Sequence, residues 1–198
     1  MVGSNATRIF SKWGSVMEEL WKIASQPDSM KIQDKYGKIL LDQPLPKDFD
    51  GFPNIYTNRT RLQNLLYQYA TSIGITFHFD AAVSEYFEDG ISAGIVLAGL
   101  KYLADFVVVA DGVHSKGRVF VTGSAEKATK SGFAVYRSWF PLENLRQHPL
   151  TKSFAESGKD QFAIWIAEDT HAILTTNVKL QTCTCFATHK VSDICVLS

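Results

Sequence analysis

Apolar residues recur at helical spacing in the first third of the chain. Ala6, Ile9, Phe10 and Trp13 stand at i, i+3, i+4 and i+7, which predicts an amphipathic helix capped by Gly14. The stretch 15–18, Ser-Val-Met-Glu, predicts a capping box that opens a second helix. A third helix is predicted over about 59–73, and Gly74 ends it. Its apolar stripe consists of Leu62, Leu65, Leu66, Tyr69, Ala70 and Ile73.

Alternating apolar and polar positions predict strands in the rest of the chain. Residues 30–42 predict a hairpin, and 75–79 predict a strand with three apolar side chains on one face. An antiparallel excursion should follow, with turns at residues 89–90 and 98–99. The segments 133–140 and 162–187 predict further strands, so the last third should be mainly β.

One apolar run is continuous rather than alternating. Residues 106–110, Phe-Val-Val-Val-Ala, lead directly into Asp111 and Gly112. A short Val-rich run of this kind is typical of a strand that is buried on both faces. Ligands of open α/β sheets bind outside the carboxyl ends of such strands, which is where Asp111 and Gly112 lie. An ordinary Asp-Gly turn after a strand is the simpler interpretation of the dipeptide alone.

Composition excludes several classes of protein. The 198 residues carry 20 basic and 20 acidic side chains, without a basic run, so a nucleic-acid partner or an anionic membrane is not expected. No signal peptide or membrane span is evident, and a cytoplasmic protein is expected. Three cysteines make no disulfide framework, and Cys183 and Cys185 are expected to fill a strand face rather than bind a metal.

The segment 104–118 closely resembles the Asp-Gly motif of the FAD-dependent aromatic hydroxylases, the flavoprotein monooxygenases of the salicylate hydroxylase and p-hydroxybenzoate hydroxylase type. The matching positions are Asp105, Asp111, Gly112, Ser115 and Arg118. Three further stretches resemble motifs of the same family: Ser-Asn-Ala-Thr-Arg-Ile-Phe at 4–10 with Trp-Gly at 13–14, Arg-Thr-Arg-Leu at 59–62, and Gly-Phe-Ala-Val-Tyr-Arg at 132–137. The resemblance covers residues 3 to about 194.

The resemblance implies an α/β fold with two layers. One is a partial FAD-binding domain, Rossmann-like and three-layered but without its first βαβ unit, formed by 1–27 and 58–124. The other is a mainly antiparallel β-sheet substrate domain formed by 28–57 and 125–198. We expect strand 105–110 to be central in the first layer, with helix 59–73 packed on it.

The resemblance also implies roles for individual residues. Arg59, Val83, Asp111 and Gly112 are expected to contact FAD, Val83 through its backbone. Arg137 is the candidate catalytic residue, because the family's arginine there faces the flavin and can polarise a phenolate. Arg61, two positions from Arg59, is the less favoured of the two arginines. Asp111, Gly112 and Arg59 are expected to line one cleft, with Arg137 facing it.

The implied function is an NADPH- or NADH-linked monooxygenase that hydroxylates a small aromatic or polyketide-like substrate. The family's Gly-x-Gly-x-x-Gly and Gly-Asp-Ala-Ala-His motifs do not occur in the 198 residues. We therefore expect a truncated protein with weak FAD retention and doubtful activity. Two alternatives stay open: a non-catalytic remnant or binding module of the same fold, and an NAD(P)-dependent dehydrogenase.

Overall fold

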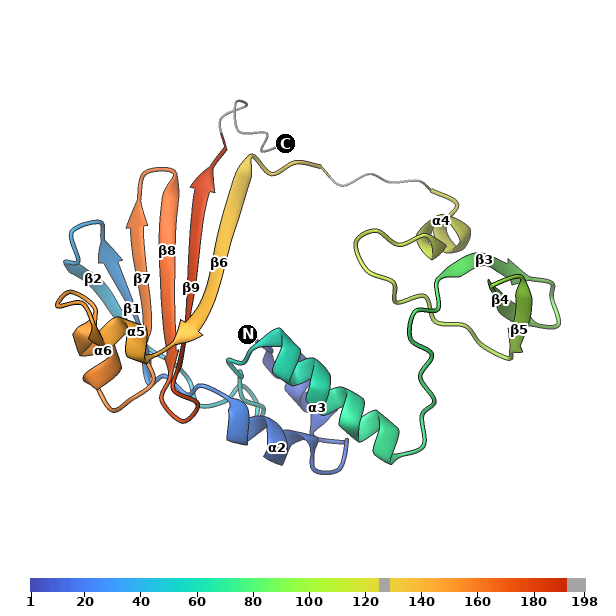
Figure 1. Cartoon of the computed structure of the whole chain (residues 1–198), viewed down its shortest axis with the longest axis horizontal. Helices are drawn as coiled ribbons and strands as arrows, with labels where there is room; N and C mark the ends of the chain where they lie inside the picture. Colours follow the sequence, from blue (N-terminus) through green and yellow to red (C-terminus); the bar gives the residue numbers. More distant parts are fainter. Residues whose placement is uncertain (125–128, 192–198) are drawn as a thin grey trace. The chain divides into compact units, whose positions relative to one another are not determined.

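The computed structural model describes residues 1–124 and 129–191, which form two compact units (Figure 1). The first unit contains residues 1–74 and the described residues from 132 onward. The second unit contains residues 75–131, apart from 125–128. Each unit has its own sheet, so the two are described separately.

Three helices open the first unit: α1 (Ser4–Phe10), α2 (Val16–Ile23) and α3 (Arg59–Ser72). Their apolar faces meet around a small core in which Leu20 and Ile55 are fully buried. The loop before α3 is fastened to α1, since the hydroxyl of Thr7 donates to the carbonyl of Pro53 at 2.8 Å. The predicted helices are therefore present, but α1 ends at Phe10 with Ser11 as its C-cap, so the prediction that Gly14 caps it is wrong.

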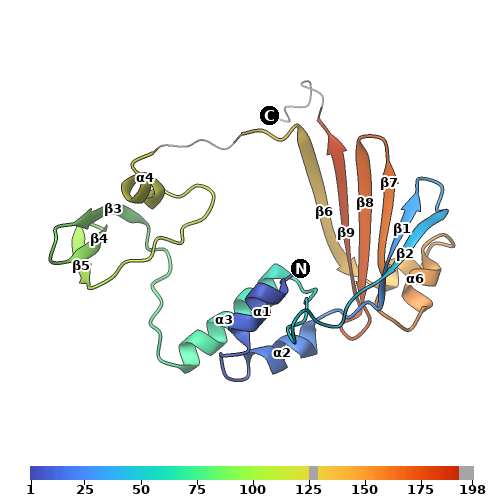
Figure 2. The same ribbon diagram turned by 180° about the vertical axis from the view of Figure 1, so that it is seen from behind.

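A six-stranded sheet makes up the rest of the first unit (Figures 1 and 2). Its strands, in spatial order, are β2 (Ile39–Pro44), β1 (Ser29–Asp34), β7 (Phe162–Ala167), β8 (Thr170–Asn177), β9 (Thr182–Lys190) and β6 (Phe133–Pro141). All neighbours are antiparallel except the parallel pair β1 and β7. This confirms the predicted β-rich layer built from the hairpin and the last third of the chain.

The two faces of this sheet have different neighbours. On one face, Leu174 and Cys183 pack with Leu142 and Leu145 of the segment that includes the short helices α5 (Glu143–Arg146) and α6 (Lys152–Glu156). Burial there raises the pKa of the Cys183 thiol to about 12, so Cys183 is a core residue rather than a reactive thiol. The opposite face, called here the open face, carries Arg137, Trp139, Thr184 and Phe186, as the strand register requires.

Hydrogen bonds tie the helices of the first unit to the end of the sheet. The Ser25 hydroxyl donates to the carbonyl of Thr176 at 2.7 Å, and the Asn177 side chain donates to the carbonyl of Ile23 at 3.1 Å. The backbone amide of Ser25 also donates to Tyr56, at 2.8 Å, which brings the loop before α3 to the same place. The start of α3 is thereby held near the open face.

The second unit is smaller. It contains a three-stranded antiparallel meander of β3 (Val83–Glu88), β4 (Ala93–Leu97) and β5 (Leu100–Ala104), followed by α4 (Gly117–Thr122). Both predicted turns are present: Asp89 and Gly90 join the first two strands, while Ala98 and Gly99, both with positive φ, join the last two. Tyr86 of β3 and Phe120 of α4 lie 6.1 Å apart between ring centres.

Three local predictions are wrong. Residues 105–110 form no strand, and Phe106 and Val108 are 81% and 74% exposed. Residues 75–79 form no strand either. A strand needs a hydrogen-bonding neighbour, and no strand in residues 1–124 or 129–191 pairs with either segment. Ser15 precedes α2 as predicted, but its φ and ψ of −84° and 5° are not the extended values of a capping residue, and its side chain makes no capping bond.

The chain divides at 74/75 and 131/132. The predicted grouping of 1–27 with 58–124, and of 28–57 with 125–198, stays a prediction, as does the packing of α3 on residues 105–110. Residues 125–128 and 192–198 of the predicted substrate domain lie outside the described residues. Mixed α/β architecture with a larger sheet and a smaller antiparallel one is confirmed.

Candidate functional site

The Asp-Gly motif forms a closed loop between residues 111 and 118. The carboxylate of Asp111 accepts the backbone amides of Lys116 at 2.8 Å and Gly117 at 3.3 Å. The hydroxyl of Ser115 accepts the amide of Arg118 at 3.0 Å, which starts the turn of α4. The motif positions 111, 115 and 118 therefore organise the loop itself.

The guanidinium of Arg118 completes this loop. It donates to the carbonyl oxygens of Gly112 and Val113, both at 3.3 Å. The Gly112 carbonyl also accepts the amide of Ser115 at 3.1 Å, so the guanidinium adds a second bond to that carbonyl and supplies a partner for the carbonyl of Val113. Arg118 thus has a structural partner on the loop, and its charge fixes the path of the backbone after Asp111.

Hydrogen bonding lowers the pKa of Asp111 to about 2. The Ser115 hydroxyl is the largest cause, and the amides of Gly117 and Lys116 add to it. Asp111 is exposed and is therefore a fixed negative charge at neutral pH. The phenol of Tyr86 also approaches it at 3.4 Å, and burial together with this carboxylate raises the pKa of Tyr86.

Gly112 and Val83 place backbone atoms rather than side chains at the predicted cofactor positions. Gly112 has φ of +83°, and a Cβ added there would meet nothing within 4 Å. The positive φ requires a glycine at this position, and the backbone there is open to a ligand. Val83 begins β3 opposite Leu97, and the register shifts between Val83 and Glu85.

Arg59 is the first residue of α3 and lies in the first unit. Asn58 caps this helix by accepting the amide of Thr60 at 2.8 Å, so the helix start is well formed. The first turn holds no acidic residue. Within the described part of the chain, the exposed guanidinium of Arg59 has neither an ion pair nor a hydrogen bond, which leaves its charge available to an anion.

Arg137 lies on β6, the edge strand of the larger sheet, directly opposite Phe186 of β9. Its guanidinium carbon is 5.5 Å from the centre of the Phe186 ring. No carboxylate among the described residues pairs with it. Arg137 is therefore an uncompensated cation on the open face, held by an aromatic neighbour.

The structure places the predicted residues in two groups. Asp111, Gly112 and Val83 belong to the second unit, and Arg59 and Arg137 belong to the first. Whether all five line one cleft stays a prediction. Their roles in binding FAD or in catalysis also stay predictions.

A pocket of about 90 Å³ lies between the start of α3 and the open face. Sequence reasoning missed most of its walls, including Tyr56, Trp139, Thr175, Thr184 and Phe186. Arg61, the less favoured arginine, is also a lining residue, and its guanidinium carbon is 6.0 Å from the centre of the Trp139 ring. The signal was available in part, because alternation along β6 puts Trp139 on the same face as Arg137.

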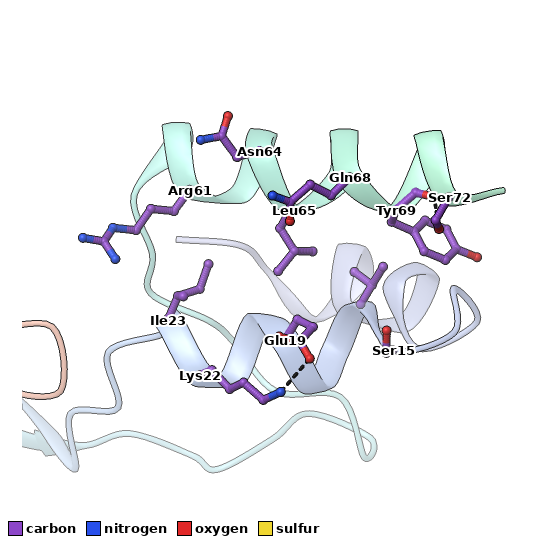
Figure 3. Close-up of a pocket in the computed structure, with 11 residues that line it drawn as sticks. Ser15, Glu19, Lys22, Ile23, Arg61, Asn64, Leu65, Gln68, Tyr69 and Ser72 are labelled. Carbon is purple, nitrogen blue, oxygen red and sulfur yellow. Dashed lines mark hydrogen bonds and ion pairs between the residues drawn. The ribbon is translucent and has the colours of Figure 1, made fainter. Parts of the chain in front are cut away.

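A larger groove of about 520 Å³ runs between α2 and α3 (Figure 3). Leu65 and Tyr69 extend from α3 toward α2, while Lys22 pairs with Glu19 along its rim at 2.6 Å. Lys22 and Glu19 neutralise each other on this rim, and the apolar groups pack on the helical core. Arg61 also lines the groove, without an ion pair among the described residues. The groove offers ordinary helix packing and no concentrated chemistry.

Two kinds of feature are absent from the part of the chain that the structure describes. No helix in the described ranges has the length and apolar character needed to cross a bilayer. Within the same ranges, no three His, Cys, Asp or Glu side chains are grouped as metal ligands.

Sequence comparison finds relatives along nearly the whole chain. The FAD-dependent monooxygenase nodY2 of Hypoxylon pulicicidum is 30% identical over 194 residues, which are 96% of this chain and 42% of that protein. Asperlicin C monooxygenase of Petromyces alliaceus is 32% identical over 96% of this chain and 41% of its own length. The chain thus spans about two fifths of these relatives. No family model matches it.

Comparison with solved structures agrees. CtdE, crystallised with FAD and a substrate, matches 98% of this chain and 48% of its own at 29% identity, with a TM-score of 0.88. A salicylate hydroxylase substrate complex, at 18% identity and a TM-score of 0.73, shares the fold over 97% of this chain. The chain is homologous, over nearly its whole length, to part of the FAD-dependent monooxygenases.

Proposed function

We propose that this chain contributes cofactor and substrate contacts of a flavin-dependent monooxygenase that hydroxylates a small aromatic or polyketide-like molecule with NADPH or NADH as co-substrate. The observation that carries the proposal is similarity to FAD-dependent monooxygenases along 96% of the chain, with the motifs around Arg59, Asp111 and Arg137 in family order. The relatives do not favour a dehydrogenase or a binding module.

The residues present fit FAD. The open backbone at Gly112 admits close approach of a planar cofactor, and the unpaired Arg59 beside a helix start suits its phosphates or ribityl oxygens. Bound FAD supplies the redox chemistry that activates oxygen for hydroxylation. Because the Asp111 carboxylate holds the amides of its own loop, its contribution is to fix the loop geometry and to place a negative charge there.

Arg137 is proposed to act on the substrate. Its cation lies on an open sheet face beside an aromatic ring and without a carboxylate partner. A phenolate or carboxylate on an aromatic substrate would be stabilised there by charge, and the adjacent Phe186 would contact the ring. This role concerns binding and polarisation by the side chain itself.

The test is FAD titration of residues 1–198 with isotope labelling and NMR. We expect weak binding, with shifts at the amides of Gly112 and Arg59 and little change at Leu40. Arg59→Gln should weaken binding roughly ten-fold, since charge-assisted hydrogen bonds to a phosphate are lost. Lys12→Gln, which removes an exposed charge from the same unit, should leave the affinity unchanged.

One outcome would contradict this proposal, and another would correct only the expected affinity. Shifts confined to residues outside the Asp111–Arg118 loop and the start of α3 would show that the assigned cofactor contacts are wrong. A strongly yellow purified protein, with a large FAD-dependent rise in melting temperature, would overturn only the expectation of weak retention, because stabilisation grows with affinity.

A further inference from the structure

The pocket between the start of α3 and the open face has an unbalanced charge. Among the described residues, its lining combines aromatic residues with hydroxyl and amide groups, and the only charged side chain is that of Arg61. None of these described lining residues carries a carboxylate. Met1, which also lines the pocket, adds the terminal amine of the chain. A concave site with cationic groups, polar donors and no acid favours an anionic ligand.

The positive charge of Arg61 lines this pocket and does not stabilise α3. It stands in the first turn of the helix, where the partial positive charge of the amides makes a cation unfavourable. No acidic residue in that turn offsets it, and among the described residues no ion pair reaches its guanidinium. The contact that holds it is the Trp139 ring, 6.0 Å from the guanidinium carbon.

The same wall of the pocket also holds a polar group without a partner. The hydroxyl of Thr57, which precedes the cap of α3 and lines the pocket, is buried and has no hydrogen-bond partner. Buried hydroxyls are normally paired, so this one leaves hydrogen-bonding capacity unused beside the pocket. Thr57 and Arg61 lie on the two sides of Asn58, so both reach the pocket from one helix start.

We infer that Arg61, stacked on Trp139, is a specificity-determining residue that binds the anionic edge of the aromatic substrate in this pocket. The inference rests on the proposed function for the aromatic character of the ligand. A volume of about 90 Å³ holds a carboxylate or enolate and the adjoining part of a ring. Arg137, two positions from Trp139 on the same face, then contacts the ligand at a separate point.

The test compares two probes of equal shape, benzoate and benzamide, by titration of residues 1–198 with the indole NH of Trp139 followed by NMR. Benzoate should bind about ten-fold more tightly than benzamide, because only benzoate makes charge-assisted bonds to the guanidinium. Arg61→Gln should abolish this preference, and Arg61→Lys should retain part of it. Lys12→Gln is the charge control and should keep the full preference.

Each result decides the inference. Equal affinity for the two probes in the unmodified chain, or an unchanged preference in Arg61→Gln, would overturn it, and the first comparison needs no variant to fold. FAD titration of the same samples separates the two proposals. Shifts at Gly112 and Arg59 without a benzoate preference leave the cofactor role and reject the anion subsite. A benzoate preference that depends on Arg61, without any shifts on addition of FAD, supports the anion subsite and rejects the cofactor role.

Discussion

The carboxylate of Asp111 accepts the amide of Lys116 at 2.8 Å, five residues further along the chain. This bond closes the loop in which Ser115 starts a helix turn and Arg118 binds two carbonyls. The spacing of the Asp-Gly motif therefore has a local explanation. These hydrogen bonds build a turn that exposes the Gly112 backbone, and they are made without any bound ligand.

Acid should open this loop only at very low pH. The folded pKa of Asp111 is lowered to about 2 from 3.8, so its stabilising contribution is present above pH 3.8 and is lost as the pH falls toward 2. The amide shifts of Lys116 and Gly117 should move in that window. Asp111→Asn should remove the transition, and a transition above pH 4 would contradict the assignment.

Glycine is required for different reasons at two positions of the same loop. A Cβ at Gly117 would lie 2.6 Å from Val109 and 2.8 Å from Tyr86, so Gly117→Ala should destabilise the second unit by about 1–3 kcal/mol through overpacking. A Cβ at position 112 would meet no atom, but an alanine there would have to adopt φ of +83°. Gly112→Ala should therefore lower the free energy of unfolding by about 1–2 kcal/mol.

Urea unfolding of the two alanine variants checks this. Trimming Val109 to alanine in the Gly117→Ala background should recover stability, because the added methyl then gains space. The same trimming should not rescue Gly112→Ala, whose strain is conformational. Equal rescue of both would show that the close contact is not the cause.

The helical core should depend on Leu20. Its side chain, on α2, is 0% exposed in a cluster with Phe10 of α1 and Ile55, so Leu20→Ala should lower the free energy of unfolding by about 2–5 kcal/mol. Leu40 is 53% exposed on β2, and Leu40→Ala should change the free energy of unfolding by less than about 0.5 kcal/mol. Thermal and urea denaturation measure both. A similar loss in the two variants would contradict the packing described.

The apolar segment 106–110 should make the chain self-associate. Phe106 and Val108 are exposed in a segment outside any sheet, and exposed apolar side chains on unpaired backbone promote association. Replacing both with lysine should raise solubility and shift sedimentation toward the monomer. The control is Val121→Lys, at an exposed position of α4, and an equal gain there would rule out a specific role for the segment.

The sequence by itself determined the elements whose stability is local. Helical spacing predicts α1 and α3, and turn dipeptides predict the meander from Val83 to Ala104, because side-chain periodicity and positive-φ residues act within a few positions. Motif spacing also identified Asp111 and Gly112, whose hydrogen bonds are made inside one loop.

Only the tertiary structure decided what depends on partners distant in sequence. Residues 105–110 have the composition of a buried strand, but a strand exists only beside another, and the described chain provides none. The pocket of Arg61 is the opposite case. Arg61 and Trp139 are 78 positions apart, and no local pattern predicts that a helix start and an edge strand meet, because their approach is set by sheet register and helix packing.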